Sequence, residues 1–133
     1  MLRSGQHRIE LHWGELPYDL DLQLYVRTSA KQYHLVHATN PEVPGIAVLD
    51  VDVVTGYGVE TMVLESIVSS SLYTITVTQN TYEVPLSKSG AVVKVYNISG
   101  LVMERKVPTQ LRPDLWGVAQ FRSGSLVPIE ISY

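Results

Sequence analysis

Short runs in which apolar and polar residues alternate recur along this sequence, and turn residues separate them. Alternate side chains of a β-strand point to opposite faces, so such a run predicts a strand with one buried and one wet face. The clearest run is 19–26, Asp-Leu-Asp-Leu-Gln-Leu-Tyr-Val, in which every second residue is aliphatic. Residues 72–78 alternate in the same way, with three threonines on the polar side. Antiparallel β-structure is therefore the first expectation.

The same periodicity predicts strands along most of the chain. The expected strands are 7–13, 19–26, 33–37, 46–54, 60–68, 72–78, 91–96, 101–107, 116–121 and 126–131. Hairpin turns are expected at 97–100 and 122–125, and a loop at 40–45. Helical periodicity is nearly absent, which disfavours parallel α/β folds. We therefore expect an all-β antiparallel sandwich of about 8–10 strands, with a jelly-roll or immunoglobulin-like layout.

Composition narrows the range of functions. The net charge is −3 and the pI is about 5.7, so the chain has no basic field that would hold nucleic acid. There is no cysteine, which excludes disulfides and thiolate metal sites. No apolar run is long enough for membrane insertion.

Residues 1–133 are expected to form a single β-sandwich domain, excised from a longer protein. The length suits one domain with a full hydrophobic core. The chain enters a strand-like stretch soon after Met1 and ends in another at 129–133. No apolar signal-peptide core precedes the first run, so composition alone assigns no compartment.

Two Asp-x-Asp pairs carry the most informative side chains: Asp19 with Asp21, and Asp50 with Asp52. Residues two apart on a strand share one face, roughly 6.5–7 Å apart. If the two strands approach each other, four carboxylates meet and repel, and a hard divalent cation relieves that repulsion. Ca²⁺ takes six to eight oxygen ligands, and Glu60 and the glycine turn before it offer more of them. The sequence therefore predicts a Ca²⁺ site at these five residues.

The alternative is that these carboxylates hold no metal. Acidic residues on the wet face of a strand are usually solvated. Arg8, Arg27, Lys31 and Arg105 offer surface ion pairs, which contribute little free energy. The spacing also differs from that of an EF-hand loop, whose ligands lie close together around a glycine. Both interpretations stay open at the level of sequence.

Catalytic chemistry has weaker support. The four histidines lack the spacing of a helical metal site, and no Gly-x-Ser-x-Gly elbow frames a serine. The three serines at 69–71 predict a turn between strands. A glycosidase needs two carboxyls across a substrate cleft, and a compact sandwich leaves little chain to build one. We therefore expect no enzyme, and a small carboxylate hydrolase is the least favoured alternative.

Aromatic residues offer a second kind of binding site. Tyr18, Tyr57 and Tyr82 lie near predicted turns and are candidates for an exposed, sugar-stacking surface. Trp116 lies in an alternating run and is expected in the core. The leading hypothesis is a non-catalytic binding or structural accessory module with a protein or glycan partner. The alternative is a carbohydrate-binding module that uses these tyrosines.

Several segments resemble the DUF2135 (YfaP-like) domains of bacteria. Residues 13–22, Trp-Gly-Glu-Leu-Pro-Tyr-Asp-Leu-Asp-Leu, resemble that family's W-G-x-x-P-x-D-L-D-L opening. Residues 49–52 and 56–61 resemble its L-D-x-D and G-x-G-P-E-T segments, and the similarity covers about residues 10 to 131. The resemblance implies an extracytoplasmic β-sandwich that serves as an accessory module of a larger envelope or surface protein. Pre-peptidase C-terminal domains have a similar layout, and some of them are stabilised by calcium.

The sequence departs from the family pattern at three positions. Gln23 stands where the family often has histidine, Val59 where it has proline, and Ser71 where it has glycine. The aspartate pairs, the two glycines and Glu60 are retained. The resemblance implies a periplasmic or extracellular location, although this chain carries no signal peptide.

Overall fold

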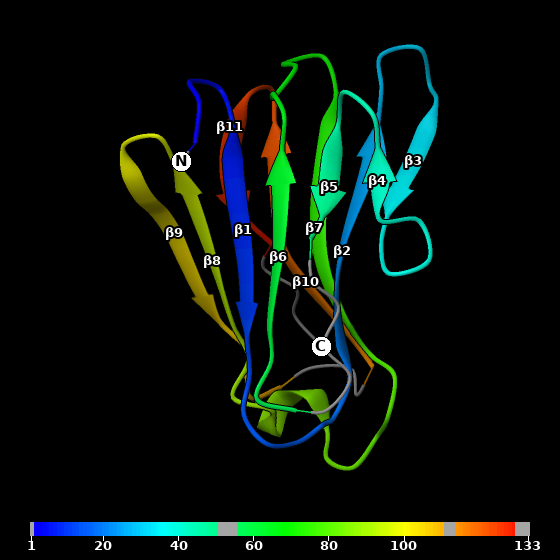
Figure 1. Cartoon of the computed structure of the whole chain (residues 1–133), viewed down its shortest axis with the longest axis vertical. Helices are drawn as coiled ribbons and strands as arrows, with labels where there is room; N and C mark the ends of the chain where they lie inside the picture. The colour runs from blue at the N-terminus through cyan, green and yellow to red at the C-terminus, as the bar shows by residue number, and fades with distance from the viewer. Residues whose placement is uncertain (1, 51–55, 111–113, 130–133) are drawn as a thin grey trace.

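The protein folds as two antiparallel β-sheets packed face to face (Figure 1). The structure is a computed structural model that describes residues 2–50, 56–110 and 114–129. The first sheet has the order β4-β5-β6-β1-β8-β9 and the second β11-β10-β7-β2-β3. The elements are β1 (His7–His12), β2 (Leu20–Arg27), β3 (Tyr33–Val36), β4 (Glu42–Val43), β5 (Ala47–Leu49), β6 (Val59–Leu64), β7 (Leu72–Gln79), η1 (Leu86–Lys88), β8 (Val92–Asn97), β9 (Gly100–Lys106), β10 (Leu115–Arg122) and β11 (Ser125–Pro128). The all-β sandwich expected from the alternation is confirmed.

The core lies between the sheets and contains the aliphatic side of each alternating run. Leu20, Leu22 and Leu24 of β2 are fully buried, and they pair with the buried residues of β7 along the whole strand. Trp116 is buried, as its place in an alternating run predicts.

Within the described residues, no helix has the length and apolar character needed to cross a membrane.

Most strand boundaries agree with the periodicity, and the exceptions have local causes. β6 ends at Leu64, four residues early: Glu65 still donates to the Ile46 carbonyl, but by Val68 the backbone N–H donates to the Tyr73 hydroxyl instead of a strand. The expected loop at 40–45 contains the two-residue strand β4, which Pro41 and Pro44 keep short. The ends of the strands expected at 46–54 and 126–131 lie partly outside the described residues.

The predicted turns are confirmed. Asn97 pairs with Gly100 at the β8–β9 hairpin, and Arg122 pairs with Ser125 at the β10–β11 hairpin. In the second hairpin, Ser123 and Gly124 both have positive φ, which matches the right-handed twist of the flanking strands. The serines at 69–71 form a turn that leads into β7.

One strand is covered unevenly by its neighbours. β2 pairs with β7 from Leu20 to Arg27, but β3 pairs only with Leu24 to Arg27. Within the described part of the chain, no strand therefore pairs with the first half of β2 on its β3 side. Backbone groups on that stretch need other partners.

Candidate metal centre

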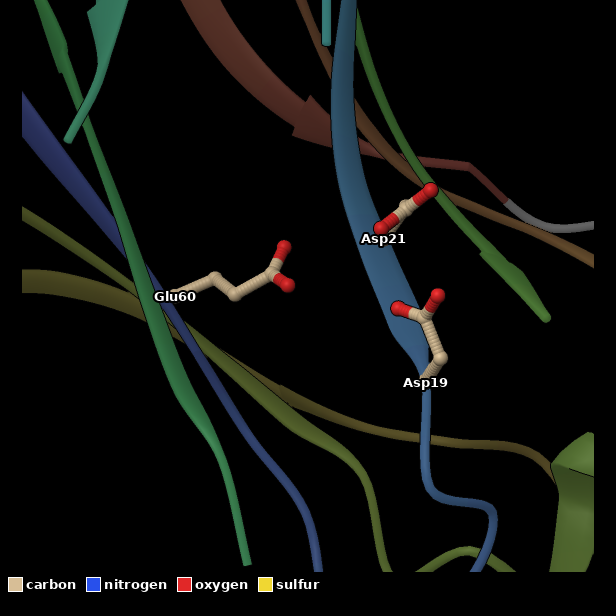
Figure 2. A group of neighbouring side chains, drawn as sticks. All are labelled: Asp19, Asp21 and Glu60. Atoms are coloured by element: carbon tan, nitrogen blue, oxygen red, sulfur yellow. The ribbon is translucent and has the colours of Figure 1, made fainter. Parts of the chain in front are cut away.

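Three carboxylates meet at the uncovered start of β2. Asp19 precedes β2, Asp21 lies within it, and Glu60 lies in β6 of the opposite sheet. One carboxylate oxygen from each lies within 4.8 Å of the other two. Figure 2 shows the Glu60 side chain extending from β6 toward β2, where the two aspartates lie. We call Asp19, Asp21 and Glu60 the acidic triad.

Glu60 holds a position that normally belongs to an apolar residue. It lies on the same face of β6 as Met62 and Leu64, which point into the core, and it is 0% exposed. Its Oε1 accepts a hydrogen bond from the backbone N–H of Leu22 at 2.9 Å. The Glu60 carboxylate therefore serves a backbone donor that a longer β3 would have paired. Burial of an ionised carboxylate is costly unless hydrogen bonds and an opposite charge compensate it.

Asn80 joins the two aspartates. Its backbone N–H donates to the Asp19 carbonyl at 3.0 Å. Its side-chain amide donates to Asp19 Oδ2 at 3.3 Å and also to Asp21 Oδ2. Asp21 is only 8% exposed. Asp19 Oδ1 is buried too, and within the described residues it accepts no hydrogen bond. The aspartates are thus held in place while an oxygen of Asp19 stays available to a ligand.

Close packing fixes the two segments that deliver the triad. The Trp13 indole N–H donates to the Pro17 carbonyl at 2.9 Å, and the Trp13 ring lies so close to Gly58 that a Cβ there would overlap it. The N–H of Gly56 donates to the Tyr18 carbonyl at 2.8 Å. The loop before β2 and the glycine turn before β6 are therefore locked together. These segments are the ones that carry the two family-like motifs.

Of the other two predicted ligands, only Asp50 lies within the described residues, and it does not join the triad. Asp50 follows β5 and is exposed, and its N–H donates to the Thr61 carbonyl at 2.8 Å. Asp52 lies outside the described residues. The structure thus brings together three of the five predicted ligands. Asp50 is not in the group because its backbone continues the pairing with β6 while its side chain faces solvent.

Among residues 2–50, 56–110 and 114–129, no ion pair involves Asp19. Arg8 pairs with Glu10 at 2.8 Å on β1, and Arg27 lies at the far end of β2 from the triad. The side chains that hydrogen-bond to Asp19 are the neutral groups of Asn80 and Thr81.

A hydrogen-bonded loop borders the triad. Thr81 Oγ1 accepts from the N–H of Asp19 at 3.1 Å and donates to Glu83 at 2.6 Å. Glu83 also accepts from the N–H of Tyr18 at 2.9 Å. Desolvation works to raise the pKa of Glu83, but the hydrogen bonds from Thr81 and Tyr18 outweigh it, so the pKa lies below its usual value. Glu83 thus stays ionised and adds negative charge near the triad.

The three candidate tyrosines are exposed, as predicted, and their segments meet around the triad. Tyr57 is 73% exposed, Tyr82 64% and Tyr18 48%. Tyr18 contacts Gly56, next to Tyr57, and Glu83, next to Tyr82, through its backbone. Trp13, in contrast, is buried and serves the packing of the loop.

Asn80 is the site residue that the sequence analysis missed. It follows β7 directly, and it reaches the triad because Leu20 pairs with Gln79 and so places Asn80 beside Asp19. Nothing in the local pattern of residues 79–81 reveals this pairing, because it depends on which strands are neighbours.

Comparisons with known proteins assign no function to this chain, so a proposed function must rest on the geometry of the acidic triad. No family model, curated protein or solved structure matches this chain. The relation to DUF2135 domains therefore stays a prediction from the motifs at 13–22 and 49–61.

Proposed function

We propose that this chain is a non-catalytic binding or structural module in which Asp19, Asp21 and Glu60 hold a Ca²⁺ ion. One observation carries the proposal: a carboxylate from a core position of one sheet meets Asp21 of the other sheet, and Asp19 just before it, within 4.8 Å. Three carboxylates at this separation repel one another, and a divalent cation converts the repulsion into attraction. The ion would tie the start of β2 to the start of β6.

The donor set favours calcium among the common metals. All three side chains offer hard carboxylate oxygens, and Zn²⁺ sites usually contain nitrogen or sulfur ligands. Oxygens bound to Ca²⁺ lie 2.3–2.6 Å from the ion, hence at most about 5 Å from one another. The triad meets this limit. Backbone carbonyls and waters would complete a flexible coordination shell.

The burial of Glu60 supports a structural role over a catalytic one. A catalytic carboxylate must touch substrate, whereas the Glu60 side chain is wholly covered and binds the backbone of β2. Carboxylates of glycosidases face each other across an open cleft. The resemblance to envelope-associated accessory domains supports the same role, since extracellular modules bind Ca²⁺ in the range of about 10⁻⁴ to 10⁻³ M.

Isothermal titration calorimetry tests the proposal. We expect chelator-treated protein to bind one Ca²⁺ with a Kd of about 10⁻⁵ to 10⁻³ M. Asp19→Asn and Asp21→Asn should each weaken binding by about tenfold or more, because each removes a ligand charge. Glu42→Gln, an exposed change on β4, is the matched control and should leave the affinity unchanged.

Asp50→Asn distinguishes the triad from the site of four aspartates and Glu60 expected from the sequence, since only that larger site predicts a loss of Ca²⁺ affinity in this variant. Absence of binding at millimolar Ca²⁺ would refute the metal site.

A second candidate function is carbohydrate binding by Tyr18, Tyr57 and Tyr82. The observation that favours it is that three exposed rings come from segments in backbone contact around the triad. Aromatic faces of this kind stack on apolar faces of sugars.

A glycan array followed by affinity measurement tests this candidate. For any glycan bound, Tyr57→Ala should weaken binding by about tenfold. Tyr33→Ala is the matched control, because Tyr33 is equally exposed at 73% but lies on β3 at the other end of β2. An array without hits, or equal losses in the two variants, would contradict a tyrosine-based sugar site.

A further inference from the structure

A second site lies at the other end of β2. A surface pocket of about 290 Å³ is formed by three connections that meet there, between β2 and β3, between β6 and β7, and between β10 and β11. These connections lie at the top of Figure 1, and the starts of β2 and β6, which carry the acidic triad, lie toward the bottom. The pocket therefore shares no residue with the proposed Ca²⁺ site.

Cations line this pocket without matching carboxylates. Arg27 and Lys31 come from the β2–β3 side and Arg122 from the end of β10. Among the described residues, no aspartate or glutamate lines the pocket, and none forms an ion pair with these three cations. Such a concentration of positive charge is unusual in a chain whose net charge is −3. Like charges that converge on one pocket favour the binding of an anion.

Serine residues line the same pocket as the cations. Ser69, Ser70 and Ser71 line one wall, and Ser29 and Ser123 line the others. Each hydroxyl can donate one hydrogen bond to an oxygen of a ligand. Guanidinium, ammonium and hydroxyl donors together are the groups that recognise phosphate and sulfate oxygens.

Local hydrogen bonds hold one wall in shape. The N–H of Thr28 donates to the Gln32 carbonyl at 2.9 Å, and the N–H of Lys31 donates to the Thr28 carbonyl at 2.9 Å. This tight turn places Arg27 and Lys31 on the same pocket. The backbone that carries Arg27 and Lys31 is thus arranged before a ligand arrives, which lowers the entropic cost of binding.

We propose that this pocket binds a tetrahedral oxyanion, phosphate or sulfate, as a free ion or as the end group of a monoester. The volume lies near the lower limit of ligand pockets, so it suits a small ion or one anionic group with its first attached atoms. Arg27 and Arg122 would approach the oxyanion from two sides, and the serine hydroxyls would bind its remaining oxygens.

Titration followed by two-dimensional NMR tests this site. Phosphate and sulfate, at ionic strength matched with chloride, should shift amide resonances of residues 27–31, 69–72 and 122–124 in a saturable way. Arg27→Gln and Arg122→Gln should each weaken phosphate binding by about tenfold, because each removes a charge-assisted donor. Lys106→Gln on β9 is the matched control, since this exposed cation lies outside the pocket. Both arginines are exposed, so the variants should fold normally.

Two further ligands define the chemistry and its source. Acetate, which is planar, should bind more weakly than phosphate, and equal or tighter acetate binding would overturn the tetrahedral assignment. A phosphate monoester such as glycerol phosphate distinguishes a free ion from the end group of a larger molecule. If the monoester binds more tightly than inorganic phosphate, the pocket binds an end group; if the two bind equally, it binds the free ion. Linear shifts spread over the whole protein, or unchanged affinity in both arginine variants, would overturn the site. These outcomes are independent of Ca²⁺ binding.

Discussion

Replacing Glu60 with glutamine should abolish the rise in melting temperature that Ca²⁺ gives the unaltered protein. A ligand at a hundred times its Kd stabilises the folded state by about 2.7 kcal/mol, which corresponds to about 10 °C for a domain of this size. The change removes one ligand charge from the acidic triad, while its remaining side-chain oxygen can still accept from the N–H of Leu22. Thermal unfolding followed by circular dichroism, in excess Ca²⁺ and in excess chelator, measures the difference.

The same variant should behave differently in chelator. Without an ion, the Glu60 carboxyl group stays at a core position close to two aspartates, and a charge buried there is costly. Glutamine is neutral and nearly isosteric, so Glu60→Gln should be at least as stable as the unaltered protein in chelator. In saturating Ca²⁺ the order should reverse. This reversal separates a ligand from a residue that only packs, because a packing defect destabilises under both conditions.

Glu10→Gln is the control for this experiment. Glu10 lies on β1, and it pairs with Arg8 at 2.8 Å and with His12 at 2.9 Å. Its loss should change the melting temperature equally in Ca²⁺ and in chelator. A Ca²⁺-dependent shift that survives in Glu60→Gln would contradict the role of Glu60 as a ligand.

The periodicity of the sequence was sufficient for the fold but not for all boundaries. Alternation in 19–26 and 72–78 reports burial on one face, and burial is what the pairing of β2 with β7 produces. The end of β6 at Leu64 could not be predicted, because residues 65–68 remain partly apolar after the chain leaves the ladder. β4 could not be predicted because two residues carry no periodic signal.

The site was predictable only where it depends on local spacing. Asp19 and Asp21 lie two residues apart at the start of β2, and their convergence with Glu60 agrees with one part of the sequence hypothesis. The part that placed Asp50 in the same site is not borne out within the described residues. The burial of Glu60 could have been predicted from the local sequence, since alternate residues of a strand face the same side and Glu60 alternates with Met62 and Leu64. The role of Asn80 could not be predicted in this way, because it follows from the register between β2 and β7. Strand neighbours and register are long-range properties that a single sequence does not contain.

Replacing Gly56 with alanine should produce the second large effect, a loss of about 3–5 kcal/mol in the free energy of unfolding. Gly56 has a φ of +81°, which L-residues rarely adopt, and its added Cβ would overlap the Glu15 carbonyl oxygen. That carbonyl belongs to the loop that leads to Asp19. The loop must therefore move, and the hydrogen bond from Gly56 to the Tyr18 carbonyl is expected to break with it. Urea unfolding at constant m-value measures the loss.

Gly90→Ala is the matched variant that isolates the contribution of the contact with Glu15. Gly90 has a similar φ of +72°, but nothing lies within 4 Å of the position of its Cβ. Its replacement should therefore lower the free energy of unfolding only by the cost of a left-handed backbone conformation, about 1–2 kcal/mol. Because Gly56 lies beside the triad and Gly90 does not contact it, only Gly56→Ala should also weaken Ca²⁺ binding. Equal destabilisation by the two changes would show that contact with Glu15 does not constrain the turn, and the packing that positions Asp19 would then need another origin.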